Sequence, residues 1–129
     1  MKKLVKDMGV DKLWIKSAQI YQDGIAEKLP DIGRYSRYDV DQKGELRLRG
    51  RLRNRCSRLW RTMVITTDGV LVPCCFDKIP DFEMGSLRDK SVMEIWKGEE
   101  MNGFRKRILT DRKGIEICRN CTEGLRRMS

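Results

Sequence analysis

The chain has 129 residues, of which 36% are charged, and it carries a formal net charge of +9 at pH 7. This length allows about one domain, and no apolar run approaches the roughly 18 residues that a membrane-spanning helix needs. The N-terminal stretch MKKLVKDMGVDK has no apolar core of signal-peptide length, so we expect a soluble, cytoplasmic protein. The absence of histidine excludes histidine-ligated haem, histidine-based catalytic triads and zinc fingers of paired cysteines and histidines.

The N-terminal third predicts one α-to-β step followed by a linker. Residues 1–8 are typical of the end of a helix that stops at Gly9, and residues 12–20 predict a strand. The segment 21–39 is rich in turn-forming residues and is expected to be mostly loop, with a short helix at 25–29.

A basic stretch follows, in which GELRLRGRLRNRC alternates with a period of two. We expect a strand or extended arm over residues 46–55 that presents leucines on one face and arginines on the other. Between Arg34 and Arg61 there are ten basic residues against three acidic ones. This excess favours an anionic partner such as nucleic acid, an acidic peptide, a phosphate-bearing cofactor or an anionic metal cluster, although a solvated basic face is the simpler alternative.

The C-terminal half predicts a hairpin and two helices. The β-rich runs 63–66 and 70–72 are joined through Thr-Asp-Gly, a strong hairpin signal. A polar loop at 77–90 precedes a short helix, for which Ser91 is the expected N-cap and Glu94 the partner in a capping box. A second helix over residues 99–111 is expected to bury Met101, Phe104, Ile108 and Leu109. The fold class predicted is therefore α+β.

Four of the five cysteines suggest one metal centre. Cys118 and Cys121 form a C-x2-C knuckle, whose tight turn lets two sulfur atoms converge, and Cys56 and Cys74 bracket the predicted hairpin. An odd number of cysteines would leave one thiol unpaired in a disulfide framework, and a protein without an export signal normally keeps its thiols reduced. The spacing alone fits either four-cysteine zinc or an iron-sulfur cluster.

The string C-SRLWRTMVITTD-G-VLVP-C, which runs from Cys56 through Gly69 to Cys74, is followed by MGSL, EIW and the C-x2-C knuckle. This pattern resembles the SPASM domain of radical S-adenosylmethionine proteins, over about residues 56–124. The resemblance implies that Cys56, Cys74, Cys118 and Cys121 ligate one auxiliary [4Fe-4S] cluster. No further cysteine follows Cys121, so the chain is closest in pattern to the shortened, single-cluster form known as a twitch domain.

The resemblance also implies what the chain lacks. Cleavage of S-adenosylmethionine in this family needs a C-x3-C-x2-C motif, and the sequence has none. We therefore expect residues 1–45 to be a remnant of a partial (β/α) barrel plus a linker, and residues 46–129 to be the cluster domain. The chain would then be the non-catalytic C-terminal part of an oxidoreductase or peptide-modifying enzyme, with S-adenosylmethionine bound by a missing barrel and an acidic peptide as a conceivable substrate.

Within this family the cluster would serve electron transfer or structural support, because four cysteine ligands leave no open iron position. The arginines close to the ligands in sequence are expected to stabilise its charge: Arg55, Arg58, Arg61 and Arg119. The interval G-x4-C selects Cys74 rather than Cys75, so Cys75 is expected to be a packed thiol beside the centre. The alternative function is a basic, four-cysteine zinc module in which Trp60, Tyr35 and Tyr38 contact nucleic acid.

Overall fold

The computed structural model describes residues 2–14, 36–121 and 123. Helix α1 (Lys2–Asp7) confirms the predicted N-terminal helix, and Gly9 follows it with a φ of 67°, a left-handed value that ends a helix readily. The predicted strand at 12–20 lies outside the described residues except for its first three, which form no strand. The predicted helix at 25–29 and Tyr35 lie wholly outside them.

The basic stretch forms one strand of a small hairpin. Strand β1 (Tyr38–Val40) pairs antiparallel with β2 (Leu46–Leu48), with Asp39 opposite Arg47. The strand is shorter than predicted because Gly50 adopts a φ of 103°, which interrupts the extended backbone. The predicted alternation in burial is confirmed, because the arginines of residues 46–55 are exposed and the leucines are half-buried, but a regular strand forms only at Leu46–Leu48. The predicted division of the chain between residues 45 and 46 falls inside this hairpin and stays a prediction.

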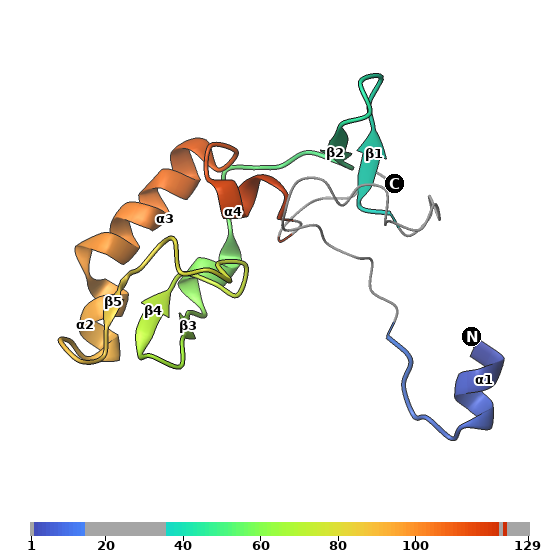
Figure 1. Ribbon diagram of the computed structural model, residues 1–129, viewed down its shortest axis with the longest axis horizontal. Coiled ribbons are helices and arrows are strands. Elements are labelled where there is room, and N and C mark those ends of the chain that lie inside the picture. The colour runs from blue at the N-terminus through green and yellow to red at the C-terminus, as the bar shows by residue number, and fades with distance from the viewer. Residues whose placement is uncertain (1, 15–35, 122, 124–129) are drawn as a thin grey trace.

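A three-stranded antiparallel sheet forms the centre of the domain (Figure 1). Strand β3 (Val64–Ile65) pairs with β4 (Val70–Val72) through the predicted hairpin, and Gly69 in its turn has a φ of 79°. Strand β5 (Gly85–Ser86) pairs with the other edge of β4. Sequence reasoning placed these last residues in a polar loop, because two residues are too few to show a strand pattern.

The helices follow the sequence prediction closely. Helix α2 (Val92–Lys97) begins at Ser91 with the predicted capping box to Glu94, and α3 (Glu99–Asp111) follows after Gly98. A short 3-10 helix, η2 (Ser57–Trp60), starts directly after Cys56, and α4 (Glu116–Arg119) contains Cys118. The described part is thus a small α+β fold with two small antiparallel sheets and no closed barrel.

The hydrophobic core joins the three-stranded sheet to α2, α3 and η2. Its members come from every one of these elements and include two of the site cysteines, Cys56 and Cys118. Leu71, Met101 and Ile115 are completely inaccessible to solvent, whereas Leu109 is 54% exposed, so its predicted place in the core was wrong. Leu109 directly follows the buried Ile108, and neighbouring residues on a helix point in different directions.

None of the helices in the described residues is both long and apolar enough to cross a bilayer.

Candidate metal centre

Three separate segments of the chain carry the four predicted ligands. Cys56 is the residue before η2, Cys74 lies two residues beyond β4, and Cys118 and Cys121 lie in and after α4. All four are free thiols, and each is at most 8% exposed. The fold thus places cysteines that are as much as 65 residues apart in the sequence in the interior of the protein.

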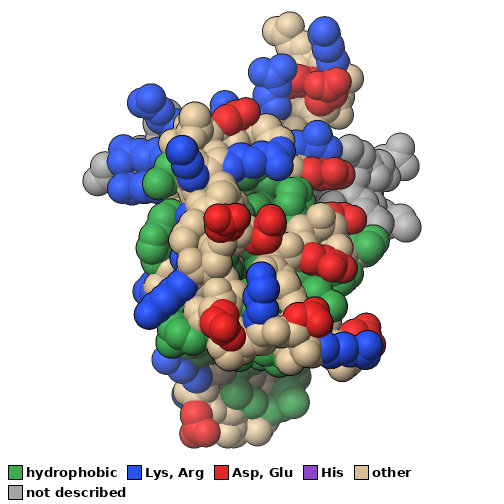
Figure 2. All heavy atoms as spheres, turned by 90° about the vertical axis from the view of Figure 1, so that its left-hand side faces the viewer, with side chains coloured by type: hydrophobic (Ala, Val, Ile, Leu, Met, Phe, Trp, Pro, Cys, Tyr) green, Lys and Arg blue, Asp and Glu red, His purple; other side chains and the backbone are tan. Residues whose placement is uncertain are grey.

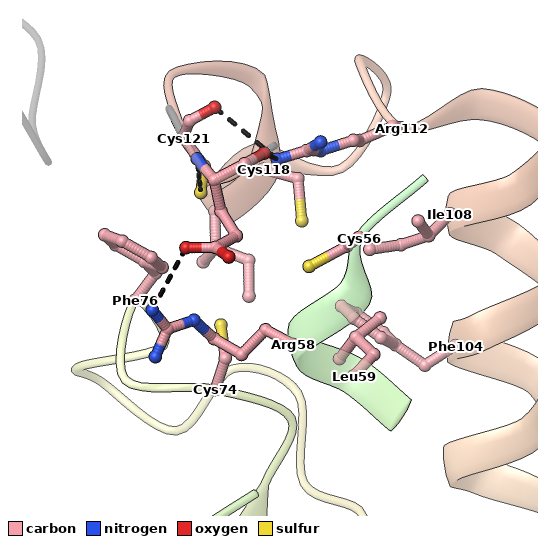
Figure 3. Close-up of a pocket in the computed structure, with 12 residues that line it drawn as sticks. Cys56, Arg58, Leu59, Cys74, Phe76, Phe104, Ile108, Arg112, Cys118 and Cys121 are labelled. Atoms are coloured by element: carbon pink, nitrogen blue, oxygen red, sulfur yellow. Dashed lines mark hydrogen bonds and ion pairs between the residues drawn. The ribbon is translucent and has the colours of Figure 1, made fainter. Parts of the chain in front are cut away.

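The same four cysteines line a single pocket between η2, the segment after β4, the C-terminal half of α3 and the knuckle. Figure 3 shows the side chains of Cys56, Cys74 and Cys118 pointing into the space that they share. Apolar side chains form much of the remaining wall, among them Leu59, Phe104 and Ile108. Three charged residues complete the lining: Arg58, Arg112 and Glu123. Among the described residues, no group of three or more histidines, cysteines or acidic residues is arranged for a single metal ion.

Burial in this pocket raises the pKa of three of the four thiols. It raises the pKa of Cys74 to about 11 and that of Cys118 to about 12, and it also raises the pKa of Cys121. Burial disfavours the charged thiolate, and the neighbouring thiols add to the effect for Cys118. Metals bind the thiolate form, so a metal here would have to displace protons from these groups.

The knuckle is shaped by its own backbone. The amide of Cys121 donates to the carbonyl oxygen of Cys118 at 3.1 Å, which closes the turn. The amide of Glu123 then donates to the Cys121 sulfur at 3.4 Å. Tyr38, from the hairpin of β1 and β2, donates its hydroxyl to the carbonyl oxygen of Asn120 at 3.5 Å, so the hairpin also touches the knuckle.

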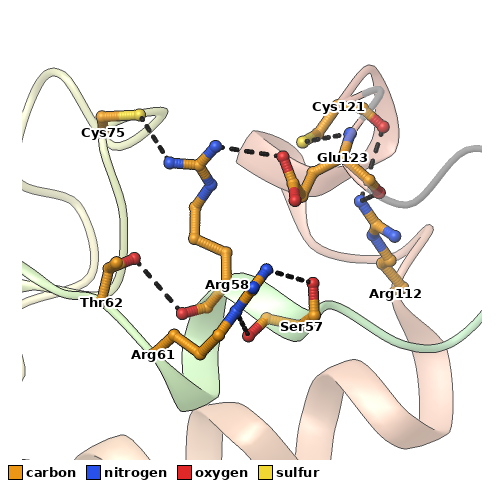
Figure 4. A network of polar contacts seen from close by, with 8 residues as sticks. All are labelled: Ser57, Arg58, Arg61, Thr62, Cys75, Arg112, Cys121 and Glu123. Carbon is orange, nitrogen blue, oxygen red and sulfur yellow. Dashed lines mark hydrogen bonds and ion pairs between the residues drawn. The ribbon is translucent and has the colours of Figure 1, made fainter.

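Arg58 lies at the rim of the pocket and joins two of its walls (Figure 4). Its guanidinium forms an ion pair with Glu123 at 3.0 Å and reaches the sulfur of Cys75 at 4.0 Å. Arg61, also predicted to serve the centre, instead donates to Ser57 on its own short helix. Of the four arginines chosen from sequence proximity, Arg58 is the one that lines the pocket.

Cys75 does not share the environment of its neighbour. It is exposed, whereas Cys74 is buried, and it is not among the residues that line the pocket. The prediction of a packed thiol beside the centre was therefore wrong. The preference for Cys74 over Cys75 as the inward-facing cysteine agrees with the burial of Cys74. The two residues lie in a bend and a turn after β4, where the amide of Asp77 donates to the carbonyl oxygen of Cys74 at 3.2 Å.

Arg112 is a site residue that sequence reasoning missed. It follows α3, is 1% exposed and lines the same pocket as the four thiols. Against the larger effect of burial, its charge lowers the pKa of Cys118 and Cys121. It lies six residues before the knuckle and carries no motif, so no signal in the sequence distinguishes it from the other arginines.

The surface gives the nucleic-acid alternative little support on the face that carries α2 and α3. Figure 2 shows acidic and basic side chains interspersed there, with apolar side chains between them. In the hairpin of β1 and β2, Arg47 and Arg49 form ion pairs with Asp41 and Asp39. Part of the basic excess is thus neutralised locally.

The structure is a small α+β scaffold in which four buried thiols line one pocket. The sequence matches the SPASM family, described as an iron-sulfur cluster-binding domain, over residues 56–122. The match covers more than half of the chain, so the protein belongs to the SPASM family of iron-sulfur cluster-binding domains.

A curated relative gives a second comparison. The chain is 29% identical over 59 residues to an S-adenosyl-L-methionine-dependent 2-deoxy-scyllo-inosamine dehydrogenase of Niallia circulans. The aligned part is 45% of this chain and 24% of the relative, so the chain corresponds to about a quarter of that enzyme. No solved structure matches the chain.

Proposed function

We propose that Cys56, Cys74, Cys118 and Cys121 hold one [4Fe-4S] cluster. The observation that carries the proposal is the shared pocket, which all four cysteines line and from which Cys75 is excluded. Four thiolates suit a [4Fe-4S] cluster, whose irons each take one cysteine ligand. The family membership supports iron-sulfur binding in general, and the number of cysteines in the pocket is the basis for one cluster of this type.

The cluster would serve electron transfer or support the fold. When bound, a fully cysteine-ligated cluster supplies a one-electron redox centre with no open iron position for a substrate. The chain's own part is to hold four thiolates in a pocket walled by Leu59, Phe104 and Ile108, which limits access of water. Restricted solvent access and nearby charges are the means by which a protein adjusts such a centre.

The wider setting would be an enzyme that generates radicals from S-adenosylmethionine. The relative in Niallia circulans is named as an S-adenosyl-L-methionine-dependent dehydrogenase, and this sequence has no C-x3-C-x2-C motif of its own. We propose that the chain works with a barrel domain that carries the motif and acts on a peptide, protein or small molecule. A cytoplasmic location, where thiols stay reduced, fits the free cysteines.

Anaerobic reconstitution with iron and sulfide tests the proposal directly. We expect a brown protein with about four irons and four sulfides per chain, and a Mössbauer spectrum of a [4Fe-4S] centre. Iron content should be unaffected when zinc is present in equal amount. A colourless protein that keeps one tightly bound zinc would support the zinc module instead and would overturn the proposal.

The proposed partner is tested separately by the genomic context. The reading frame upstream of residue 1, or a neighbouring gene, should encode C-x3-C-x2-C. If neither does, the assignment to a radical S-adenosylmethionine enzyme is wrong, although cluster binding by this chain would be unaffected.

A further inference from the structure

The buried arginine at the pocket requires an explanation. Arg112 is 1% exposed and is one of the largest fully buried side chains in the described part of the protein. Arginine is almost never fully buried unless it is paired, because transferring its charge from water to an apolar interior is costly. A charge in this position is expected to have a partner of opposite sign.

The oxygen atoms that accept hydrogen bonds from Arg112 are all neutral, and the Cys121 thiol is a further partner of its side chain. Nη1 donates to the carbonyl oxygen of Arg55 at 2.7 Å and to that of Arg53 at 3.5 Å. Nη2 donates to the carbonyl oxygen of Glu123 at 2.8 Å and to that of Cys121 at 3.5 Å. The guanidinium thus ties the segment before Cys56 to the knuckle. Its contacts on the knuckle side are drawn in Figure 4.

These hydrogen bonds satisfy N–H donors of Arg112, but they do not neutralise its positive charge. Within residues 2–14, 36–121 and 123, Arg112 forms no ion pair with a carboxylate, and its buried Nε has no hydrogen-bond partner. The nearby Glu123 directs its carboxylate to Arg58 instead. The groups near Arg112 that become negative when a metal binds are the thiols lining the same pocket.

We propose that Arg112 is the buried counter-charge of the thiolate site and a positioning residue for its ligands. Through the carbonyl contacts it fixes the chain on either side of the pocket, next to Cys56 and at Cys121. Through its charge it offsets the negative charge that four thiolates bring to an apolar interior, and nearby positive charge makes an anionic cluster easier to reduce. The inference rests on the proposed function, since it assigns a role toward the same centre.

The test compares substitutions at Arg112 with one at a second arginine. R112M removes the charge and the donors, R112Q keeps an amide donor without the charge, and R112K keeps the charge with fewer donors. The matched control is R105M. Arg105 also donates to carbonyl oxygens, those of Leu59 and Trp96, and it stacks on the Trp96 ring, but it does not line the pocket.

Two readouts are measured on the reconstituted full chain: the midpoint potential of the cluster and the rate of iron loss to a chelator. We expect R112M and R112Q to have a lower potential than wild type and to lose iron about 10- to 100-fold faster, as is usual when a group that supports metal ligands is removed. R112K should keep a potential near that of wild type but lose iron faster. R105M should unfold at a lower temperature with the potential unchanged.

Unchanged midpoint potentials in R112M and R112Q, with iron loss no faster than in R105M, would overturn the inference. Arg112 would then only hold the two backbone segments together. If neither charge-removing variant folds, R112K decides: a potential equal to that of wild type supports the role of the charge, and a lowered one contradicts it. Failure of the wild-type chain to bind an iron-sulfur cluster at all is a different result, because it would overturn the proposed function before any variant is compared.

Discussion

At the scale of single residues, adjacent cysteines in the sequence CC have opposite environments. Cys74 is buried in the pocket, and Cys75 is exposed, with its sulfur 4.0 Å from the guanidinium of Arg58. The chain turns between them: the amide of Asp77 donates to the carbonyl oxygen of Cys74 at 3.2 Å, and Cys75 lies inside this turn. This pair therefore offers a matched comparison in which the position changes by one residue and the chemistry stays the same.

We expect C74S to lose most of its iron after reconstitution and C75S to keep the wild-type amount. The serine in C74S removes a proposed ligand, while the serine in C75S replaces a thiol outside the pocket. Iron and sulfide analysis together with the visible spectrum measures the outcome. Equal iron binding by the two variants would show that the ligand assignment is wrong.

The buried thiols also predict how the iron-free protein responds to pH. Folding raises the pKa of Cys74 to about 11 and that of Cys118 to about 12, from an ordinary value of 9.0. A pKa that is higher in the folded than in the unfolded state adds stability that is complete below the unfolded value and is lost as the pH rises through the folded one. The iron-free chain should therefore lose stability progressively above about pH 9.

Urea unfolding of the iron-free chain at several pH values measures this loss. C74S is the matched control, since it removes one of the titrating groups while the lysines remain, and its loss of stability between neutral and alkaline pH should be smaller than that of wild type. An identical loss in the two proteins would contradict the assigned burial of Cys74.

At the scale of elements, α3 shows how a helix contributes to both the core and the site. Its buried residues Met101, Phe104 and Ile108 recur at three- and four-residue intervals, and its C-terminal end leads directly to Arg112. Phe104 makes an edge-on contact with Phe82, with ring centroids 5.2 Å apart. The loop that carries Phe82 is stabilised by the buried Asp77, whose carboxylate accepts hydrogen bonds from the amides of Asp81 and Phe82.

Substitutions in α3 should separate its two faces. M101A removes a side chain that is 0% exposed, so we expect it to destabilise the protein by about 2–5 kcal/mol, the usual cost of a large-to-small change in a core. L109A removes a side chain that is 54% exposed and should change stability by no more than about 0.5 kcal/mol. Denaturant unfolding of the reconstituted proteins compares the two, and a large effect of L109A would mean that another chain or domain covers this face.

At the scale of the whole molecule, the centre brings together parts of the chain that lie far apart in the sequence. The pocket receives residues from η2, the segment after β4, the end of α3 and the knuckle. The knuckle itself has little regular structure, since α4 is only four residues long. A bound cluster would therefore contribute to the folding energy as well as to redox chemistry.

Removal of iron by a chelator under anaerobic conditions should lower the thermal midpoint by at least about 4–8 °C, the shift that accompanies each 1 kcal/mol lost from a domain of this size. Amide hydrogen exchange should increase most at residues 112–121, which carry Arg112 and the two knuckle cysteines of the pocket, and least in β4 and α2. Uniform exchange across these segments, with an unchanged midpoint, would contradict the coupling of cluster binding to folding.

The local elements and the candidate ligands were predictable from sequence because their signals are short-range. The Asp-Gly turn at Gly69, the capping box from Ser91 to Glu94 and the C-x2-C knuckle each depend on residues within a few positions of one another. The predicted hairpin added Cys56 and Cys74 to the knuckle, and the family pattern selected Cys74 over Cys75. The structure brings all four cysteines to one pocket, and their role as ligands is a proposal.

The features that only the tertiary structure decided depend on contacts between segments that are distant in the sequence. Strand β5 exists because it pairs with β4, Cys75 is exposed because of the direction of the chain after β4, and Arg112 is buried because carbonyl oxygens from residues 53–55 and 121–123 surround its guanidinium. The pairing of β5 and the burial of Arg112 do not depend on neighbours in the sequence. The sequence by itself therefore determined which residues could form the centre, and the fold decided which cation and which apolar side chains surround it.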